Sequence, residues 1–169
     1  MPVPLRAREI LATLAEHRVR YVLIGGLAAV LHGAAVMTTD ADVCPDPEPG
    51  NLRRLCAALE DMHARIRAPD NDEGIPFSCD PALLQQMKML NMVTDFGNFD
   101  LSFEPAGFRY EELASHAQVT TLGGASVPLA ALDDVIESKR LADRPKDQAA
   151  LPHLYALRDE IAAQERGER

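Results

Sequence analysis

The fold is decided by residues 21–43, which read YVLIGGLAAVLHGAAVMTTDADV. A short run rich in β-branched residues ends at the glycine pair Gly25 and Gly26, which predicts a strand over residues 19–24. The alanine-rich residues that follow favour a short helix over 27–32. A glycine pair between a strand and a helix lets a phosphate approach backbone N–H groups, because no side chain stands in the way.

A second predicted strand, residues 36–44, carries Asp40 and Asp42 within an otherwise apolar segment. Side chains alternate between the faces of a strand, so these carboxylates project from one face, about 7 Å apart. Asp100 interrupts another apolar run, 99–103, in the same way. A divalent cation would relieve the repulsion among three such carboxylates, and carboxylate oxygens suit Mg²⁺. The pattern therefore predicts a metal site.

Each element of this pattern has a plainer reading. A glycine pair also makes a tight turn, and an Asp-x-Asp pair also occurs at solvated strand edges. Thr38 and Thr39 have high strand propensity and need no function, while His32 is expected to be a structural histidine. The order of strand, glycine pair, helix, Asp-x-Asp and a third in-strand Asp nevertheless favours a site for metal and phosphate.

Hydrophobic periodicity predicts the other elements. Helices are expected over 5–17, 51–66, 110–117, 132–143 and 146–164, with a helical turn over 81–86. Strands are expected over 87–93, 99–103, 118–122 and 125–129, and residues 67–81 are predicted to form a loop. This succession predicts an α/β (α+β) fold, a short mixed sheet flanked by helices. We expect a single domain over 1–169, with an α/β core over 1–130 and C-terminal helices over 131–169.

Composition narrows the class of protein. The chain has 169 residues, of which 47% are hydrophobic, and a formal net charge of −9. No apolar run is long enough to span a membrane, and the N-terminus lacks the regions of a signal peptide. The three cysteines show no metal-ligand spacing and do not support a disulfide framework. A cytoplasmic protein without a membrane partner is the default expectation.

The motifs Gly25-Gly26, Thr39-Asp40-Ala41-Asp42 and Asn98-Phe99-Asp100-Leu101 resemble those of the nucleotidyltransferase superfamily, which includes DNA polymerase beta and the aminoglycoside nucleotidyltransferases. The segments 132–139 and 144–147 extend the resemblance to its toxin-like branch, related to the AbiEii and MenT toxins. The resemblance implies the nucleotidyltransferase fold, with a helical C-terminal part that closes over the nucleotide.

The resemblance also implies roles for individual residues. Asp40 and Asp42 would bind Mg²⁺ and a nucleoside triphosphate, and Asp100 would hold a second metal ion or activate the acceptor hydroxyl. Lys139 would reach phosphate charge. The other implied nucleotide-binding residues are Gly25, Gly26, Thr38 and Thr39 beside the metal site, and Arg144, Lys146 and Asp147 at the rear of the cleft.

Two positions depart from the pattern. Many relatives have Gly-Ser in place of Gly25-Gly26, and they often carry an acidic residue where this chain has Ala150. If the absent acid matters, Asp147 acts alone or activity is reduced.

The acceptor stays open at this stage. A toxin that adds nucleotides to tRNA, held in check by a cognate antitoxin protein, is one candidate. Transfer to a protein or a small molecule and a catalytically silent nucleotide-binding module are the alternatives. The net charge of −9 disfavours broad attraction to nucleic acid. A local groove could still form from the cations Arg53, Arg54, Arg65, Arg67, Lys139, Arg140, Arg144 and Lys146.

Overall fold

A mixed sheet of eight strands runs through the computed structural model, which describes residues 1–167. The strand order is β4-β3-β5-β6-β2-β1-β8-β7. β2 pairs parallel with β6 and β1 pairs parallel with β8, whereas the other neighbours are antiparallel. The strands are β1 (Tyr21–Ile24), β2 (Asp40–Pro45), β3 (Arg65–Ala68), β4 (Asn71–Ile75), β5 (Met89–Thr94), β6 (Gly97–Ser102), β7 (Gln118–Leu122) and β8 (Ala125–Leu129).

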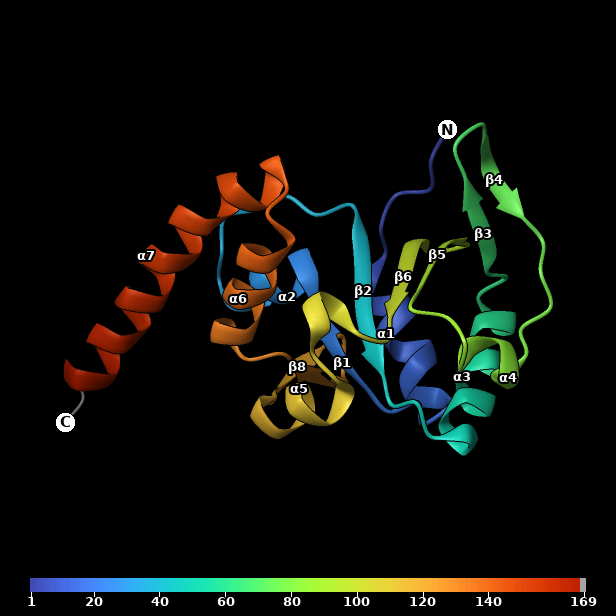
Figure 1. Cartoon of the computed structure of the whole chain (residues 1–169), viewed down its shortest axis with the longest axis horizontal. Coiled ribbons are helices and arrows are strands. Elements are labelled where there is room, and N and C mark those ends of the chain that lie inside the picture. Colours follow the sequence, from blue (N-terminus) through green and yellow to red (C-terminus); the bar gives the residue numbers. More distant parts are fainter. Residues whose placement is uncertain (168–169) are drawn as a thin grey trace.

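Helices flank this sheet (Figure 1), which confirms the predicted fold class. They are α1 (Ala7–Glu16), α2 (Gly25–Leu31), α3 (Pro49–Asp61), α4 (Pro81–Leu84), α5 (Tyr110–His116), α6 (Leu132–Ala142), α7 (Pro145–Gly167) and the short 3₁₀ turn η1 (Pro105–Gly107). In Figure 1, α2, α6 and α7 gather at one end of the molecule, and β3, β4, α3 and α4 at the other. The predicted domain extends to residue 169, so its last two residues lie outside the described residues.

Alternation along the central strands separates a core face from a polar face. On β2, Ala41 and Val43 are fully buried, and they pair with Phe99 and Leu101 of β6, which are also fully buried. The apolar stripes of α1 and α3 join the same core. The opposite face carries Asp40, Asp42 and Asp100. Packing on one face therefore fixes where the carboxylates point.

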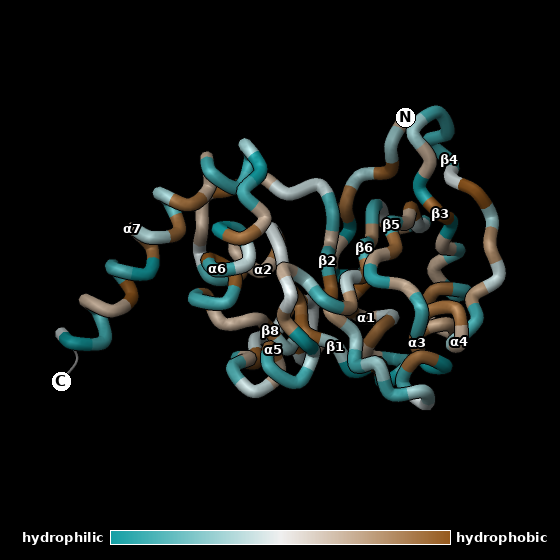
Figure 2. The backbone as a smooth tube through the Cα atoms, in the orientation of Figure 1, coloured by the Kyte–Doolittle hydropathy of each residue, from teal (hydrophilic) through white to brown (hydrophobic). Residues whose placement is uncertain are grey.

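The predicted loop over residues 67–81 is wrong over most of its length, because β3 and β4 form a hairpin there. Their sequence, RIRAPDNDEGI, offers only two large apolar side chains, so no alternation marks it as a strand pair. Figure 2 shows that the turn between them is hydrophilic. The predicted helix over 51–66 also ends earlier, since α3 stops at Asp61 and His63 has a positive φ of 49°.

Two boundaries near the glycine pair also differ. The helix predicted to start at residue 27 starts at Gly25, so both glycines belong to its first turn. The strand predicted from residue 36 starts at Asp40, which leaves residues 36–39 as part of the connection that leads into β2. Within residues 1–167, no helix has both the length and the apolar character needed to cross a membrane.

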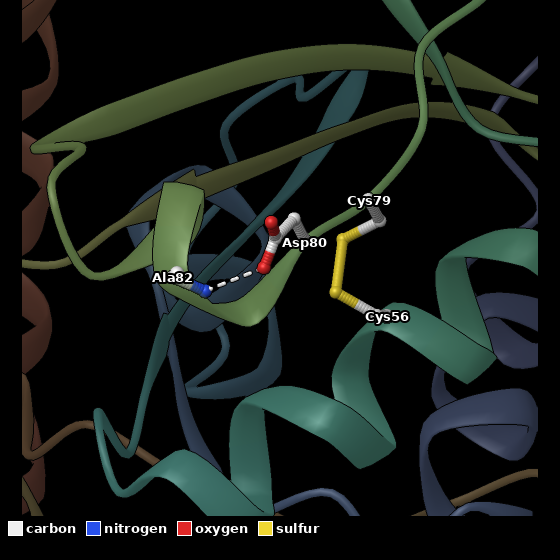
Figure 3. The surroundings of a disulfide bond; sticks show 4 residues. All are labelled: Cys56, Cys79, Asp80 and Ala82. Carbon is white, nitrogen blue, oxygen red and sulfur yellow. Dashed lines mark hydrogen bonds between the residues drawn. A yellow bond between two sulfur atoms is a disulfide. The ribbon is translucent and has the colours of Figure 1, made fainter.

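A disulfide joins Cys56 on α3 to Cys79 in the segment that leads into α4 (Figure 3). The expectation that the cysteines form no disulfide framework is therefore wrong for this pair. The residues are 23 positions apart, so their sequence spacing gave no sign of pairing. Next to the bridge, Asp80 accepts a hydrogen bond from the backbone N–H of Ala82 and caps α4. Cys44 is free and buried.

We predict that replacing both Cys56 and Cys79 by Ser lowers the free energy of unfolding by about 3 kcal/mol, because the bridge closes a loop of this length in the unfolded chain. Urea unfolding with and without reductant measures the change. Cys44→Ala serves as a control that keeps the bridge. Thiol counting on the denatured, unreduced protein should detect one reactive thiol; three would contradict the bridge.

Candidate functional site

Three carboxylates meet on the polar face of the sheet. Asp40, Asp42 and Asp100 each offer an oxygen atom, and these three atoms lie within 4.8 Å of one another. The parallel pairing of β2 with β6 brings them together, because it sets Asp42 directly beside Asp100. The predicted metal ligands are thus adjacent, and three converging carboxylate oxygens form a donor set that fits Mg²⁺.

The glycine pair lies against this cluster. Gly25 has a φ of +69°, and a Cβ added there would approach Asp42 Oδ2 to 2.6 Å. A Cβ on Gly26 would approach Thr38 Oγ1 to 2.9 Å. The Thr38 hydroxyl in turn donates to the backbone carbonyl of Asp40 at 2.9 Å. Both glycines are therefore required for the first turn of α2 to approach the acidic strand this closely.

The three carboxylates repel one another. Burial, followed by the charges of Asp40 and Asp100, raises the pKa of Asp42 to about 7. Burial also raises the pKa of Asp100, against the opposing effect of Arg67. The raised pKa values of Asp42 and Asp100 show that negative charge is disfavoured here, which gives the cluster a strong electrostatic reason to bind a cation.

Three cationic side chains, those of Lys139, Arg144 and Lys146, line the cleft near the carboxylates and form a cation wall. Asp147, at the start of α7, is fully buried and accepts hydrogen bonds from Lys139 Nζ at 3.3 Å and Arg144 Nε at 2.6 Å. Burial by itself would raise the pKa of Asp147, but the hydrogen bonds and charges of Arg144 and Lys139 lower it. The positive charges of Lys146 and Arg144 act on Asp42 from this side. Asp147 therefore fixes two of the cations opposite the carboxylates.

One cleft of about 1050 Å³ contains every residue that the sequence singled out as a site residue. Its walls include Gly25, Gly26, Thr38, Thr39, Asp40, Asp42, Asp100, Lys139, Arg144, Lys146 and Asp147. Ala150 also lines it, so the position where the resemblance implies an acid is uncharged in this cleft. His32 donates to the carbonyl of Ala130 at 2.7 Å, in agreement with the structural role expected of it.

The sequence did not reveal the partner of Asp100. Arg67 Nη2 donates to Asp100 Oδ1 at 2.6 Å and to the carbonyl of Met92 at 3.2 Å. Lys88 and Asn91 line the same side of the cleft. Arg67 was visible as a possible groove cation, but the segment that carries it was expected to be a loop, so its direction could not be inferred.

The other predicted groove cations are distributed among separate surfaces. Arg53 and Arg65 line a second cavity, and Arg54 donates to the carbonyl of Arg18. Arg140 forms an ion pair with Glu137 on α6. The eight cations therefore do not form one continuous groove.

Three solved structures share the architecture of this chain. The lincosamide antibiotic adenylyltransferase LnuA, bound to lincomycin, has a TM-score of 0.60 at 14% identity, over 91% of this chain and 99% of its own. The protein ANT(2")-Ia, in complex with adenylyl-2"-tobramycin, has a TM-score of 0.52 at 15% identity, over 93% of this chain and 95% of its own. A Thermotoga maritima protein with a provisional assignment as a nucleotidyltransferase has a TM-score of 0.50 at 16% identity, over 99% and 98%.

This chain has the nucleotidyltransferase fold. The shared architecture extends over nearly the whole length of both partners in each comparison, and it agrees with the expectation drawn from the motifs. No family model matches the sequence, and none of the curated proteins matches it.

We predict that the stability of the metal-free protein falls as pH rises from about 4 to about 7. The pKa of Asp42 is raised in the folded state, so the unfolded chain loses this proton first and the stability present at low pH is lost as pH approaches 7. The raised pKa of Asp42 corresponds to a loss of up to about 4 kcal/mol in the free energy of unfolding. Thermal unfolding across this range measures it, and Asp42→Asn should flatten the dependence.

Mg²⁺ should reverse this trend, because it binds the ionised carboxylates. The increase in melting temperature caused by Mg²⁺ should be larger near pH 8 than near pH 5. An equal increase at both values, or an increase retained in Asp42→Asn, would contradict the assigned metal site.

Proposed function

We propose that this protein is a Mg²⁺-dependent nucleotidyltransferase, which transfers a nucleoside monophosphate from a nucleoside triphosphate to an acceptor hydroxyl and releases pyrophosphate. The observation that carries the proposal is the convergence of Asp40, Asp42 and Asp100 within 4.8 Å, opposite a wall of cations in one cleft. The nucleotidyltransferase fold supports the same reaction class.

In this proposal, Asp40 and Asp42 hold the metal ion, with Asp100 as the third ligand. Bound Mg²⁺ supplies charge stabilisation at the phosphoryl oxygens. Lys139, Arg144 and Lys146 neutralise the triphosphate, and the backbone at Gly25 and Gly26 lies where phosphate oxygens can approach. Thr38 and Thr39 line the space between the glycines and the acidic strand.

The transfer forms one bond and breaks one bond. The acceptor oxygen attacks the α-phosphorus, and the bond from this phosphorus to the pyrophosphate oxygen breaks. Asp100 is the nearest candidate to take the hydroxyl proton, because it stands at the end of the carboxylate row towards Arg67 and Asn91.

The acceptor we favour is the 3′ end of an RNA, with tRNA as the leading case. Beyond Asp100, the cleft presents Arg67 and Lys88 with Glu104 as the opposing acid. Arg67 and Lys88 are the cations on this side that could meet phosphate oxygens of such an acceptor. This acceptor fits the resemblance to toxin-like nucleotidyltransferases, in which case a cognate antitoxin protein would be the regulatory partner.

A small molecule is the second candidate acceptor. It is favoured by the likeness to LnuA, whose structure contains lincomycin, and to ANT(2")-Ia, whose structure contains adenylyl-2"-tobramycin. Incubation with each labelled nucleoside triphosphate, Mg²⁺ and either total tRNA, a lincosamide or an aminoglycoside separates the two. Label in RNA supports the favoured acceptor, and label only in a small molecule supports the second. Label only in protein, or nucleotide binding without any transfer, refutes both.

Asp40→Asn should abolish transfer to any acceptor. Loss of metal binding removes several kcal/mol of transition-state stabilisation, which corresponds to a loss of about 1,000-fold or more in rate. Release of pyrophosphate measures the reaction. Asp70→Asn removes the same charge from the β3–β4 turn, outside the cleft, and should retain the rate of the wild type. Full activity of Asp40→Asn would refute the mechanism.

Asp147→Asn should weaken nucleotide binding by about 10- to 100-fold, although Asp147 is fully buried. It removes charged hydrogen bonds that hold Lys139 and Arg144 in place, each worth about 1.5–3 kcal/mol. Calorimetry with a non-hydrolysable nucleotide and Mg²⁺ measures the affinity. Asp143→Asn, in the same connection but not in the cleft wall, is the control. Unchanged affinity in Asp147→Asn would show that this cation wall does not bind nucleotide.

A further inference from the structure

A row of polar side chains crosses four neighbouring strands of the sheet. Asp42 on β2 pairs with Asp100 on β6, and Asp100 pairs with Asn91 on β5. β3 pairs antiparallel with β5, and the register of that pairing, continued by one residue, sets Arg67 opposite Asn91. The strands β3, β5, β6 and β2 are consecutive in the sheet (Figure 1). Arg67 therefore stands at the end of a row that carries two of the three carboxylates.

Arg67 reaches past β5 and holds one oxygen of Asp100. Its Nη2 atom donates to Asp100 Oδ1 at 2.6 Å and to the backbone carbonyl of Met92 at 3.2 Å. The backbone N–H of Met92 makes a longer contact with the same Oδ1 at 3.4 Å. Within residues 1–167, Asp100 Oδ2 accepts no hydrogen bond. Because the two oxygens of a carboxylate point in different directions, a fixed Oδ1 leaves Oδ2 for a metal ion or an acceptor hydroxyl.

This contact restrains a carboxylate that its neighbours repel. The three carboxylate oxygens of the cluster lie within 4.8 Å of one another, so each side chain would relax by turning away. The side chains of Asp100 and Arg67 are only 13% and 33% exposed, which limits screening of the ion pair by water. A charged hydrogen bond in this setting is strong enough to fix the direction of the Asp100 side chain.

We propose that Arg67 is a positioning residue, which fixes Asp100 so that its Oδ2 atom faces the metal ion and the acceptor hydroxyl. The effect of Arg67 on metal binding is thus exerted through Asp100. This inference rests on the proposed function, because it assigns Arg67 a task at the same site. It makes β3, which carries no ligand of its own, a necessary part of that site.

The Nε atom of Arg67 takes no part in the restraint. This atom is buried and has no hydrogen-bond partner among the described residues, and both donated bonds come from the single nitrogen Nη2. A lysine ammonium likewise carries several donors on one nitrogen and keeps the charge. Arg67→Lys should therefore retain the positioning, whereas Arg67→Met, which has neither donor nor charge, should lose it.

The first test measures Mg²⁺ affinity without nucleotide or acceptor, from metal titrations followed by melting temperature. Arg67→Met should weaken Mg²⁺ binding by about tenfold, as expected when the partner that orients a metal ligand is removed. Arg67→Lys should bind Mg²⁺ as the wild type does. The sign of the change is decisive, because loss of a positive charge beside a cation site would by itself tighten Mg²⁺ binding. Tighter or unchanged binding in Arg67→Met would overturn the inference.

A double-mutant cycle shows whether Arg67 acts through Asp100. In the Asp100→Ala background, Arg67→Met should cause no further loss of Mg²⁺ affinity, because no carboxylate remains to be oriented. Losses that simply add in the double variant would mean that Arg67 acts independently of Asp100, which contradicts the proposed role.

Arg65→Met is the matched control. It removes a guanidinium group two residues earlier on β3, from a side chain that does not line the carboxylate cleft, and should retain the Mg²⁺ affinity of the wild type. Equal losses in Arg65→Met and Arg67→Met would indicate a general disturbance of β3 and overturn the specific role. Thermal unfolding shows whether each variant is folded, and Arg67→Gln, which is shorter and uncharged, gives a second reading if Arg67→Met is not.

Kinetics with a working acceptor separate this inference from the proposed function. Arg67→Met should lower kcat by about 10- to 100-fold and leave the KM for the nucleotide unchanged, because the cation wall on the other side of the cleft binds the triphosphate. Wild-type transfer and Mg²⁺ binding in Arg67→Met would overturn the positioning role alone. A wild type that shows neither Asp40-dependent Mg²⁺ binding nor nucleotide transfer would overturn the proposed function, and the positioning role with it.

Discussion

The structure depends on the parallel pairing of β2 with β6, which sets Asp42 beside Asp100 and leaves Asp40 one step along the same face. Three carboxylates within 4.8 Å would be unfavourable in the folded state without compensation. The core face of the same strands supplies the energy that holds them together, because Ala41, Val43 and their neighbours are fully buried. Hydrophobic packing on the core face of the sheet thus offsets the repulsion among the three carboxylates on the opposite face.

The cations near these three carboxylates form two separate groups. Asp147 fixes Lys139 and Arg144 on the helical side of the cleft, and Arg67 reaches Asp100 from the opposite side. The first group acts on charge that a triphosphate would bring, whereas the second acts on a carboxylate of the cluster directly. The two sides of the cleft are therefore chemically distinct, which is what a reaction between a nucleotide and a separate acceptor requires.

The carboxylates and glycines of the site share one property, which is that each breaks a local sequence pattern. Asp40, Asp42 and Asp100 interrupt apolar strands, and Gly25 and Gly26 end a strand, so their neighbours alone make them conspicuous. The fold class followed from the hydrophobic periodicity of the predicted strands and helices.

The parts that could not be predicted depend on contacts between distant segments. The resemblance to nucleotidyltransferases placed Asp147 in the cleft, but its burial against Lys139 follows only from tertiary packing. The strands β3 and β4 have no apolar alternation, so neither the hairpin nor the direction of Arg67 could be inferred. The bridge between Cys56 and Cys79 likewise requires α3 to meet the loop before α4.

The net charge of −9 and a nucleic acid acceptor are compatible if attraction is local. At physiological ionic strength, charges separated by more than about 8 Å of solvent are largely screened. A phosphate near Lys139 or Arg144 therefore experiences these cations of the cleft far more than the carboxylates on remote surfaces. The long-range field of an acidic protein still disfavours extended contact with a duplex. The proposed RNA acceptor is therefore compatible with this net charge when a short single-stranded end, which brings few phosphates, enters the cleft.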